Sequence, residues 1–189
     1  MRVISGTAKG RRLKSFKGRA VRPTADRVKE SLFNILPRDL SGYRVLDLFA
    51  GTGNLTLEAL SRGATEASLI DQSQRAAKMI RENLRALGFS RRAHVRVMPV
   101  SRAIRALAGG ERKFDLVFVD PPYDKGWVGK VVEAIAREGL LAQDGVLIVE
   151  HSSKETAQER YGPLELRDQR CYGSTRLSFF ENTGLDSTY

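Results

Sequence analysis

The sequence is poor in cysteine and contains no long run of apolar residues. Its only cysteine, Cys171, excludes an intramolecular disulfide framework and a multi-cysteine zinc site, and we interpret it as a packing residue. The two histidines, His94 and His151, are too isolated from other possible ligands for a metal site. No apolar stretch reaches the roughly 20 residues that span a bilayer, and the start MRVISGTAKGRR lacks the apolar core of a signal peptide. We therefore expect a monomeric cytoplasmic protein with no metal and no membrane partner.

Acidic residues are absent from the first 22 positions of a chain whose net charge is +10. Residues 1–44 hold twelve Lys and Arg against three acids, a net of +9, so the remaining residues contribute only +1. A charge run is often only a solvated face, but eight uncompensated cations within residues 1–22 are more typical of a surface that neutralises phosphates. The basic arm, residues 1–22, is thus predicted to contact nucleic acid.

The arm is predicted to belong to a small N-terminal domain over residues 1–40, followed by a second domain over 41–189. Alternation in RVISG and RRLKSF indicates a short hairpin within the arm. A helix is expected from Thr24 to Leu36, with Thr24 as its N-cap and Pro37 just beyond its end. Its apolar face would consist of Val28, Leu32, Ile35 and Leu36.

From residue 44 onward, apolar runs of strand length alternate with amphipathic helical patterns. The strands are expected at 44–50, 67–71, 94–98, 114–120 and 145–150, and the helices at 54–62, 74–87, 102–108 and 127–138. The tail, residues 164–172 and 175–181, is typical of an antiparallel hairpin on one edge of the sheet. The pattern predicts an α/β fold with a Rossmann-like, mostly parallel seven-stranded sheet.

The first of these strands runs into a glycine-rich turn, DLFAGTGN (47–54), and Asp71 ends the second strand. Glycines let a ligand approach the backbone closely, and a carboxylate at that position can accept hydrogen bonds from a ribose. Thr56 stands where a dinucleotide fingerprint has its third glycine, and no triphosphate-binding GK[ST] follows. Asp47 would repel a pyrophosphate but suits a cationic sulfonium, so S-adenosylmethionine is the favoured cofactor. A tight strand-to-helix turn without a ligand is the alternative.

The fourth strand stops abruptly in VFVDPPYDKGW (117–127), because two prolines cannot continue a strand ladder. The Asp120 carboxylate and the Pro121 carbonyl could accept hydrogen bonds from an exocyclic amine, while Tyr123 offers a ring for base stacking. A rigid loop without catalytic function is the alternative for this segment alone. We expect the segment to emerge beside the glycine turn, since ligands bind beyond the carboxyl ends of parallel strands.

Both segments resemble the RsmD family, and so do GTAKGRRL (6–13), RPTADRVKESLFNIL (22–36) and YGSTRL (172–177). The resemblance implies a class I methyltransferase that uses S-adenosylmethionine to methylate the N2 amine of a guanine in 16S rRNA, with the small ribosomal subunit as partner. By the same resemblance the base would be guanine 966. The cofactor-binding residues would be Asp47, Phe49, Gly51, Gly53, Asn54, Asp71, Gln72 and Ser101; the catalytic residues Asp120, Pro121, Pro122 and Tyr123; and the RNA-binding residues Arg11, Arg12, Lys14, Lys17, Arg19, Arg22 and Arg27.

Other functions remain open on the sequence. Similar acid-proline-proline segments serve in methylation of adenine N6 in DNA and of a glutamine amide in proteins. A protein that binds RNA in ribosome assembly without catalysis could retain the same fold, and a NAD-dependent oxidoreductase is the least favoured alternative. A C5 pyrimidine methyltransferase is disfavoured because Cys171 lies outside any Pro-Cys context.

Overall fold

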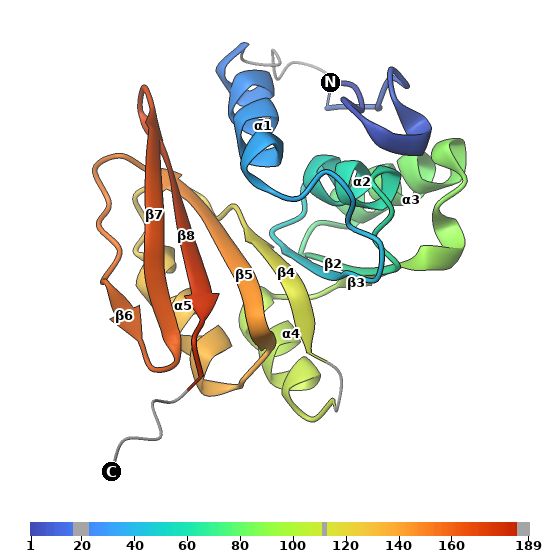
Figure 1. The fold of residues 1–189 in the computed structure, drawn as a ribbon. Coiled ribbons are helices and arrows are strands. Elements are labelled where there is room, and N and C mark those ends of the chain that lie inside the picture. The colour runs from blue at the N-terminus through green and yellow to red at the C-terminus, as the bar shows by residue number, and fades with distance from the viewer. Residues whose placement is uncertain (17–22, 111–112, 185–189) are drawn as a thin grey trace. The chain divides into compact units, whose positions relative to one another are not determined.

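The computed structural model describes residues 1–16, 23–110 and 113–184, and the chain forms two compact units, Met1–Met98 and Pro99–Tyr189. Helices and strands alternate along the first unit and as far as β5 in the second, after which β6, β7 and β8 follow one another (Figure 1). The first unit contains η1 (Gly6–Ala8), α1 (Pro23–Ile35), β1 (Arg44–Leu48), α2 (Asn54–Ser61), β2 (Glu66–Asp71), α3 (Gln74–Leu87), η2 (Ser90–Arg92) and β3 (Ala93–Val97). The second contains α4 (Val100–Ala108), β4 (Phe114–Val119), α5 (Trp127–Arg137), β5 (Leu141–Ser152), β6 (Arg160–Tyr161), β7 (Leu164–Tyr172) and β8 (Thr175–Asn182).

The strands of the first unit are parallel and stand in the order β3-β2-β1. Leu69 of β2 lies opposite Asp47 of β1 and opposite Val95 of β3. Every residue from Val45 to Leu48 is buried, as expected for a parallel strand covered on both faces. The register brings the carboxyl ends of β1 and β2 to one edge, where most of the predicted cofactor residues follow.

Helix α3 forms as its sequence pattern predicts. The Ser73 hydroxyl accepts a hydrogen bond from the Ala76 amide at 3.3 Å, and Gly88 ends the helix in the left-handed conformation. Ile80 and Leu84 are buried on the inner face. The exposed residues of α3 include four basic ones, Arg75, Lys78, Arg81 and Arg85.

Over its described part, residues 1–16, the arm forms the predicted short hairpin: the Val3 amide donates to the Arg11 carbonyl at 3.0 Å and the Leu13 amide donates to the Met1 carbonyl at 3.2 Å. A single antiparallel bridge joins Arg2 to Arg12, and η1 fills the turn between them. The amides of Ile4 and Ser5 donate hydrogen bonds to the Glu58 carboxylate of α2 instead of to a facing strand. The Gly10 amide still donates to the Val3 carbonyl at 2.9 Å, but the hairpin ends there because a side chain takes the next two amides.

Helix α1 begins one residue before the predicted N-cap, so Thr24 lies inside the helix and the prediction was wrong. Proline is favoured at the first helical position because it has no amide hydrogen to leave unpaired, and Pro23 occupies that position. Ile35 is 45% exposed, although it was predicted to be buried. Lys29 and Phe33 are buried instead, so the inner face of α1 contains a charged residue.

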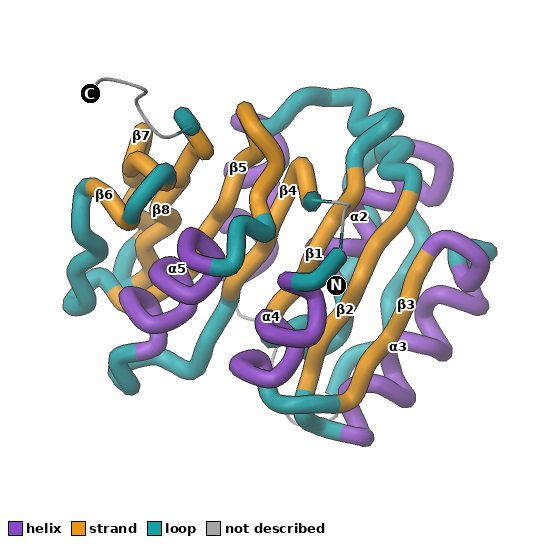
Figure 2. The backbone as a smooth tube through the Cα atoms, turned by 90° about the horizontal axis from the view of Figure 1, so that it is seen from below, coloured by secondary structure: helices purple, strands orange, loops and turns teal. Residues whose placement is uncertain are grey.

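In the second unit the strand order is β4-β5-β8-β7-β6, with β4 and β5 parallel and the remaining pairs antiparallel. Figure 2 shows α5 alongside these strands. The predicted hairpin is confirmed as β7 and β8. Strand β5 is longer than the predicted 145–150, and β6 is an eighth strand within the described residues that no sequence pattern indicated. Helix α4 begins at Val100, two residues earlier than predicted.

Cys171 is exposed on β7, so its interpretation as a packing residue was wrong. Alternate residues of a strand point to opposite faces, and the sequence pattern alone did not indicate which face of this strand is covered. His151 is buried, and its Nε2 lies 2.8 Å from the Ser178 hydroxyl. Across residues 1–16, 23–110 and 113–184, no helix is both long and apolar enough to cross a membrane, and no cluster of side chains has the composition of a metal site.

Candidate functional site

The turn after β1 carries three left-handed residues within five positions. Phe49, Gly51 and Gly53 have φ angles of 67°, 57° and 75°. A non-glycine residue held in this region stores roughly 1–3 kcal/mol of strain, which is typical of backbone held for a ligand. A Cβ on Gly53 would lie 3.3 Å from Leu69 Cδ2, so a larger residue would displace the packing beneath the turn. The left-handed turn also ends β1 at Leu48, two residues earlier than predicted.

Asp71 ties this turn to the end of β2. Its Oδ2 accepts a hydrogen bond from the Gly51 amide at 2.9 Å, and its Oδ1 accepts one from the Ser73 amide at 2.8 Å. A carboxylate offers about four acceptor positions, so about two remain for other donors. The two hydroxyls of a ribose are donors of this kind, which fits the predicted role of Asp71. Gln72, the next residue, is exposed at the same edge.

Asp47 lies inside the first unit and is only 3% exposed. Its Oδ2 accepts a hydrogen bond from the Thr56 hydroxyl at 2.7 Å. Burial raises the pKa of Asp47 to about 7, the Thr56 hydrogen bond opposes this shift, and the charge of Asp71 adds to it. Near neutral pH the carboxyl is therefore balanced between its neutral and ionised forms, and a cation nearby would favour the ionised form.

Asn54, the first residue of α2, is held by a buried lysine that the sequence analysis did not single out. Lys29 Nζ donates to Asn54 Oδ1 at 2.8 Å and to the Arg2 carbonyl at 3.0 Å, and it lies 3.0 Å from Glu58 Oε2. These acceptors match the three hydrogens of an ammonium group. Lys29 thereby connects helix α1, the arm and the residue that follows the glycine turn.

Glu58 is the acidic centre of the same network and is fully buried. Its Oε2 accepts from the Ile4 amide at 2.8 Å, and its Oε1 accepts from the Ser5 amide at 2.9 Å and from Arg62 Nε at 3.1 Å. With Lys29, four donors surround the carboxylate and fill its acceptor positions. A fully satisfied network of this kind fixes its members in place, so the arm is anchored to α2.

The predicted RNA-binding residues fall into three groups: two that contact α3, two that are exposed and three that lie outside the described residues. Arg11 donates from Nη2 to the Ala86 carbonyl at 2.7 Å, and Lys14 Nζ lies 3.0 Å from Glu82 Oε2, so both pack onto α3. Arg12 on the arm and Arg27 on α1 are exposed. Three further residues, Lys17, Arg19 and Arg22, lie outside the described residues.

The acid-proline-proline-tyrosine segment follows β4 directly. Strand β4 ends at Val119, so Asp120 is the first residue beyond it, and it is exposed. Pro121 is buried, whereas Pro122 is exposed. The buried Pro121 ring holds the backbone, including its own carbonyl, at the carboxyl end of the strand.

Tyr123 is anchored by two residues that the sequence analysis missed. Its hydroxyl donates to Glu150 Oε1 at 2.8 Å and lies 3.1 Å from the Thr175 hydroxyl. Burial raises the pKa of Tyr123, and the charge of Glu150 raises it further, so the phenol stays protonated and remains a donor. Burial also raises the pKa of Glu150, although the hydrogen bond from Tyr123 opposes the shift.

A signal for both anchors was present in the sequence. Glu150 interrupts the apolar run GVLIVEHS near the carboxyl end of β5, and Val149 lies opposite Val119 of β4. Thr175 begins β8 within YGSTRL. An acid at a strand end beside the segment could have been read as part of the site.

Ser101, predicted as a cofactor residue, is exposed in the first turn of α4, because that helix begins at Val100. The arrangement thus comprises a strained glycine turn held by Asp71 in the first unit and an anchored Tyr123 with Asp120 in the second. That the turn and Asp120 lie side by side stays a prediction.

Residues 1–181 match the family model described as Conserved hypothetical protein 95. Over 184 residues the chain is 38% identical to YlbH of Bacillus subtilis, which covers 97% of this chain and all of that protein. It is also 37% identical over 150 residues to ribosomal RNA small subunit methyltransferase D of Escherichia coli, covering 79% of this chain and 74% of that one. The chain belongs to the RsmD family. The resemblance inferred from the motifs is therefore confirmed.

Solved structures place this RsmD-family chain in the class I methyltransferase fold. The structure of yhhF from Escherichia coli has a TM-score of 0.81 and 31% identity, and covers 96% of this chain and 97% of that chain. A T. thermophilus 16S rRNA N2 methyltransferase, solved with AdoMet and guanosine, has a TM-score of 0.69 and 22% identity, and covers 88% of this chain and 45% of that chain. These likenesses confirm the predicted fold class.

Proposed function

We propose that the chain transfers a methyl group from S-adenosylmethionine to the N2 amine of a guanine in 16S rRNA. The general activity, methyl transfer to ribosomal RNA, follows from membership of the RsmD family. The family match over residues 1–181 is the observation on which the proposal rests. The cofactor contacts, the base and the accepting atom are the parts that the proposal adds. The identity of the guanine, 966 in the predicted assignment, belongs to these finer parts.

The first unit would hold the cofactor, which supplies an electrophilic methyl group on a sulfonium. Asp71 has acceptor positions left for the ribose after binding the two backbone amides. The left-handed turn from Phe49 to Gly53 lets the ligand approach the backbone. Asp47, whose pKa lies near neutrality, would become ionised beside the cation and so stabilise it.

The second unit would hold the guanine. An exocyclic amine is a weak nucleophile because its lone pair is delocalised into the ring, so the chain must favour the pyramidal nitrogen. The Asp120 carboxylate and the Pro121 carbonyl would accept hydrogen bonds from the two amine hydrogens and stabilise the positive charge that develops on nitrogen. The nitrogen lone pair would form the new bond to the methyl carbon as the sulfur–carbon bond breaks, and Asp120 would be placed to accept the amine proton that is then lost.

Tyr123 would bind the face of the same guanine by stacking, a contact worth roughly 1–3 kcal/mol. The hydrogen bond from its hydroxyl to Glu150 holds the ring at one angle. A base must leave its stack to reach such a site, so a fixed ring compensates part of the unstacking cost. Correct alignment of amine and methyl group can itself contribute about 7–11 kcal/mol to catalysis.

The proposal is tested with labelled S-adenosylmethionine and small ribosomal subunits from cells that lack the gene. Nucleoside analysis should identify N2-methylguanosine, whereas N6-methyladenosine or labelled protein would contradict the assigned acceptor. The Asp120→Asn variant should lose on the order of 100-fold in kcat, as for loss of one electrostatic contact in a transition state. Asp124→Asn is the matched control, because Asp124 is exposed four residues farther along. Equal rates for the two variants would remove Asp120 from the mechanism.

A further inference from the structure

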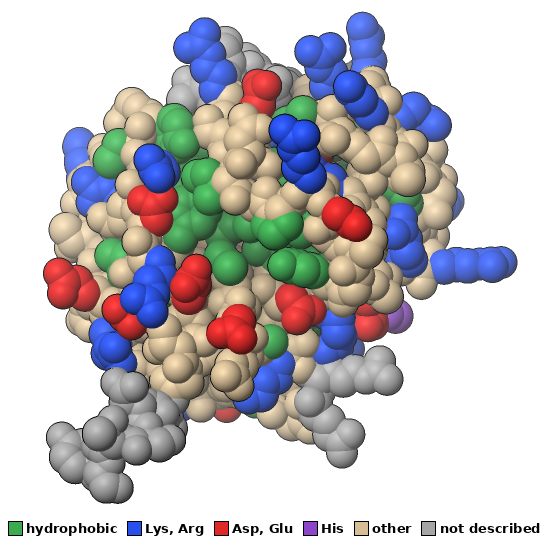
Figure 3. Space-filling view, viewed as in Figure 1, with side chains coloured by type: hydrophobic (Ala, Val, Ile, Leu, Met, Phe, Trp, Pro, Cys, Tyr) green, Lys and Arg blue, Asp and Glu red, His purple; other side chains and the backbone are tan. Residues whose placement is uncertain are grey.

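A second concentration of positive charge lies outside the arm. Residues 72–98 contain seven Lys and Arg and a single acid, Glu82, a net of +6. The near-neutral balance of residues 45–189 conceals this segment because the acids lie elsewhere in that range. Figure 3 shows basic side chains gathered over the part of the view where the arm and α3 lie. The segment's basic residues are Arg75, Lys78, Arg81, Arg85, Arg91, Arg92 and Arg96.

Three of these residues form one exposed stripe along α3, the basic stripe Lys78, Arg81 and Arg85. Their spacing of three and four residues places them on one face of the helix, opposite the buried Ala76 and Asn83. Like charges at this spacing repel one another, so the stripe costs folding stability. A cost of this kind is offset when an anion binds along the helix.

The arm borders the basic stripe on one side. Arg11 binds the carbonyl of Ala86 near the end of α3. The Lys14 amide donates to Asn83 Oδ1 at 2.8 Å, and Asn83 Nδ2 donates back to the Lys14 carbonyl at 3.1 Å. The arm therefore runs against α3 through paired backbone and side-chain contacts.

The contact continues to the start of α3, where the Arg75 guanidinium lies 5.1 Å from the centre of the Phe16 ring. From residue 86 back to 75 the helix rises by roughly 16 Å, and an extended chain from residue 11 to 16 spans about the same length. Residues 11–16 of the arm thus lie antiparallel to α3 along most of the helix. Their cations, Arg11, Arg12 and Lys14, form one surface with the stripe.

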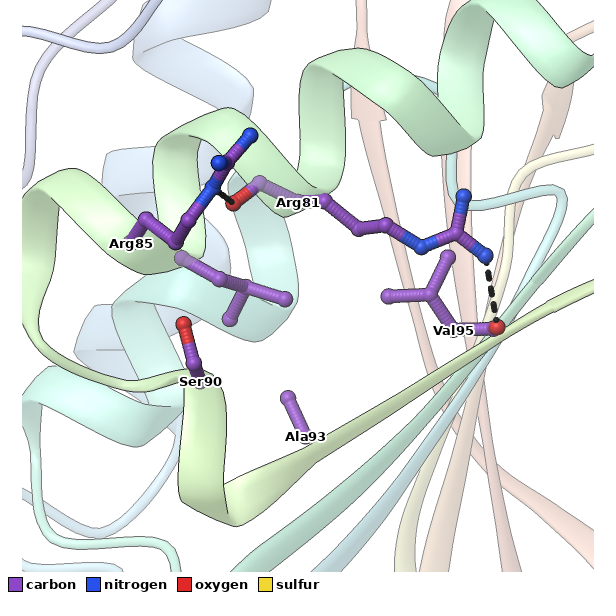
Figure 4. A pocket seen from close by; sticks show the side chains of 6 residues that line it. Arg81, Arg85, Ser90, Ala93 and Val95 are labelled. Atoms are coloured by element: carbon purple, nitrogen blue, oxygen red, sulfur yellow. Dashed lines mark hydrogen bonds between the residues drawn. The ribbon is translucent and has the colours of Figure 1, made fainter.

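A hollow of about 470 Å³ borders the stripe on its other side, between α3 and β3 (Figure 4). Two arginines stand over it. Arg81 Nη2 donates to the Val95 carbonyl at 3.2 Å, and Arg85 Nε donates to the Arg81 carbonyl at 3.4 Å. Each guanidinium carries five donors, so these bonds orient it and leave most of its donors for a ligand. The lining residues are Arg81, Leu84, Arg85, Ser90, Ala93 and Val95.

The acids near the surface do not cancel its charge. Glu82 lies 3.0 Å from Lys14, and its hydrogen bond and ion pair with that lysine lower the pKa of Glu82. The second nearby acid, Glu66 of β2, lies next to other basic groups: its carboxylate is 3.1 Å from His94 Nε2 and 3.6 Å from Arg44 Nε. The charges of Lys78 and Arg85 also lower the pKa of Glu82, but no acid among the described residues forms an ion pair with the basic stripe, so much of its positive potential extends into solvent.

We propose that α3, residues 11–16 of the arm and the hollow form the surface that binds the backbone of the RNA substrate, with phosphates along Lys78, Arg81 and Arg85. The inference rests on the proposed function and adds a binding surface that the charge count of the first 44 residues does not reveal. Arginine suits this role because its planar fork binds phosphate oxygens in pairs. The apolar floor of the hollow, Leu84, Ala93 and Val95, accommodates one unstacked nucleoside beneath the arginines.

The test is binding of a fluorescent 16S rRNA transcript, followed by anisotropy over a series of salt concentrations. In the Arg81→Glu/Arg85→Glu variant the slope of log K against log salt should become shallower by about 2, because each lost phosphate contact removes about 1. Affinity should fall roughly tenfold or more at physiological ionic strength. Lys130→Glu/Arg137→Glu on α5 is the control, with the same charge change on another exposed helix.

A conservative variant separates phosphate binding from general charge. Arg81→Lys/Arg85→Lys keeps both cations and should keep most of the salt slope. Circular dichroism and calorimetric binding of S-adenosylmethionine should be unchanged in every variant, which shows that the first unit is folded. An unchanged salt slope in the glutamate variant, or an equal loss in the α5 control, would overturn the surface assignment alone. Absence of RNA binding by the wild-type chain would overturn both this assignment and the proposed function.

Discussion

The Tyr123 hydroxyl and the Glu150 carboxylate are joined by a 2.8 Å hydrogen bond that fixes the ring assigned to base stacking. Tyr123→Phe keeps the ring but leaves Glu150 without this donor, and an unsatisfied buried acceptor costs about 1–3 kcal/mol. We expect kcat/KM for RNA to fall several-fold while the affinity for S-adenosylmethionine stays constant. Steady-state kinetics and calorimetry measure the two quantities. Tyr172→Phe on β7 is the control, and an identical kcat/KM in both variants would show that the Tyr123–Glu150 hydrogen bond does not contribute to the reaction with RNA.

Asp47 should make stability depend on pH. Its pKa is about 7 in the folded chain against an ordinary value of 3.8, so the folded state retains a proton that the unfolded state releases. Stability therefore falls as pH rises from about 4 to about 7, by at most roughly 4 kcal/mol from this group. Asp47→Asn should remove this part of the dependence in urea unfolding between pH 5 and pH 8. If the free energy of unfolding of Asp47→Asn varied with pH as it does in the wild type, the raised pKa would not belong to Asp47.

The same carboxyl should link cofactor binding to pH. A sulfonium cation favours ionised Asp47, so binding of S-adenosylmethionine near neutral pH should release protons and strengthen as pH rises towards about 7. Calorimetry in buffers of different ionisation enthalpy counts these protons. S-adenosylhomocysteine has no sulfonium charge and should release fewer. Equal proton release by the two ligands would exclude a role of Asp47 beside the sulfonium.

Removing one partner of the buried Lys29–Glu58 pair should be strongly destabilising. Lys29→Met leaves part of the Glu58 charge uncompensated at a site with no water access, a loss of about 3–5 kcal/mol. Lys78→Met, an exposed change on α3, should stay within about 0.5 kcal/mol. Urea unfolding compares the two. Similar midpoints would mean that the network contributes little.

Deleting residues 1–20 should reduce stability as well as RNA binding. The deletion removes the Ile4 and Ser5 amides that bind Glu58, so part of any loss of activity would come from unfolding. Arg12→Gln isolates the electrostatic part, since Arg12 is exposed on the arm. That variant should keep the wild-type Tm and lower the salt slope of RNA binding by about 1. A wild-type slope would remove Arg12 from the binding surface.

Local rules predicted most of the fold. Largely apolar runs such as Val45–Leu48 identify strands buried on both faces, and both ends of α3 lie where its helical pattern placed them, at residues 74 and 87. The glycine turn and the acid that holds it, Asp71, were both predicted, because the glycines and the acid at the end of the next strand have a recognisable spacing. Each of these signals lies within a short stretch of sequence.

The residues that escaped prediction depend on partners distant in the chain. Lys29 resembles a solvated lysine until Glu58, 29 positions later, is placed beside it. Glu150 acquires its role from the strand register that sets Val149 opposite Val119. The arm forms the predicted short hairpin, but the sequence does not reveal that a carboxylate of α2 takes the amides of Ile4 and Ser5 and so limits its length.

The anchoring of the arm also governs how freely its sequence can vary. Gly6 has a φ of 79°, and a Cβ built there would overlap the carbonyl of Ser61, whereas a Cβ on Gly10, with a φ of 80°, meets no atom within 4 Å. A saturation library screened for folded protein should accordingly be depleted of every replacement at Gly6 but keep asparagine and aspartate at Gly10. The arm, although rich in exposed cations, would then contain one position at which substitutions are tolerated as poorly as in the hydrophobic core.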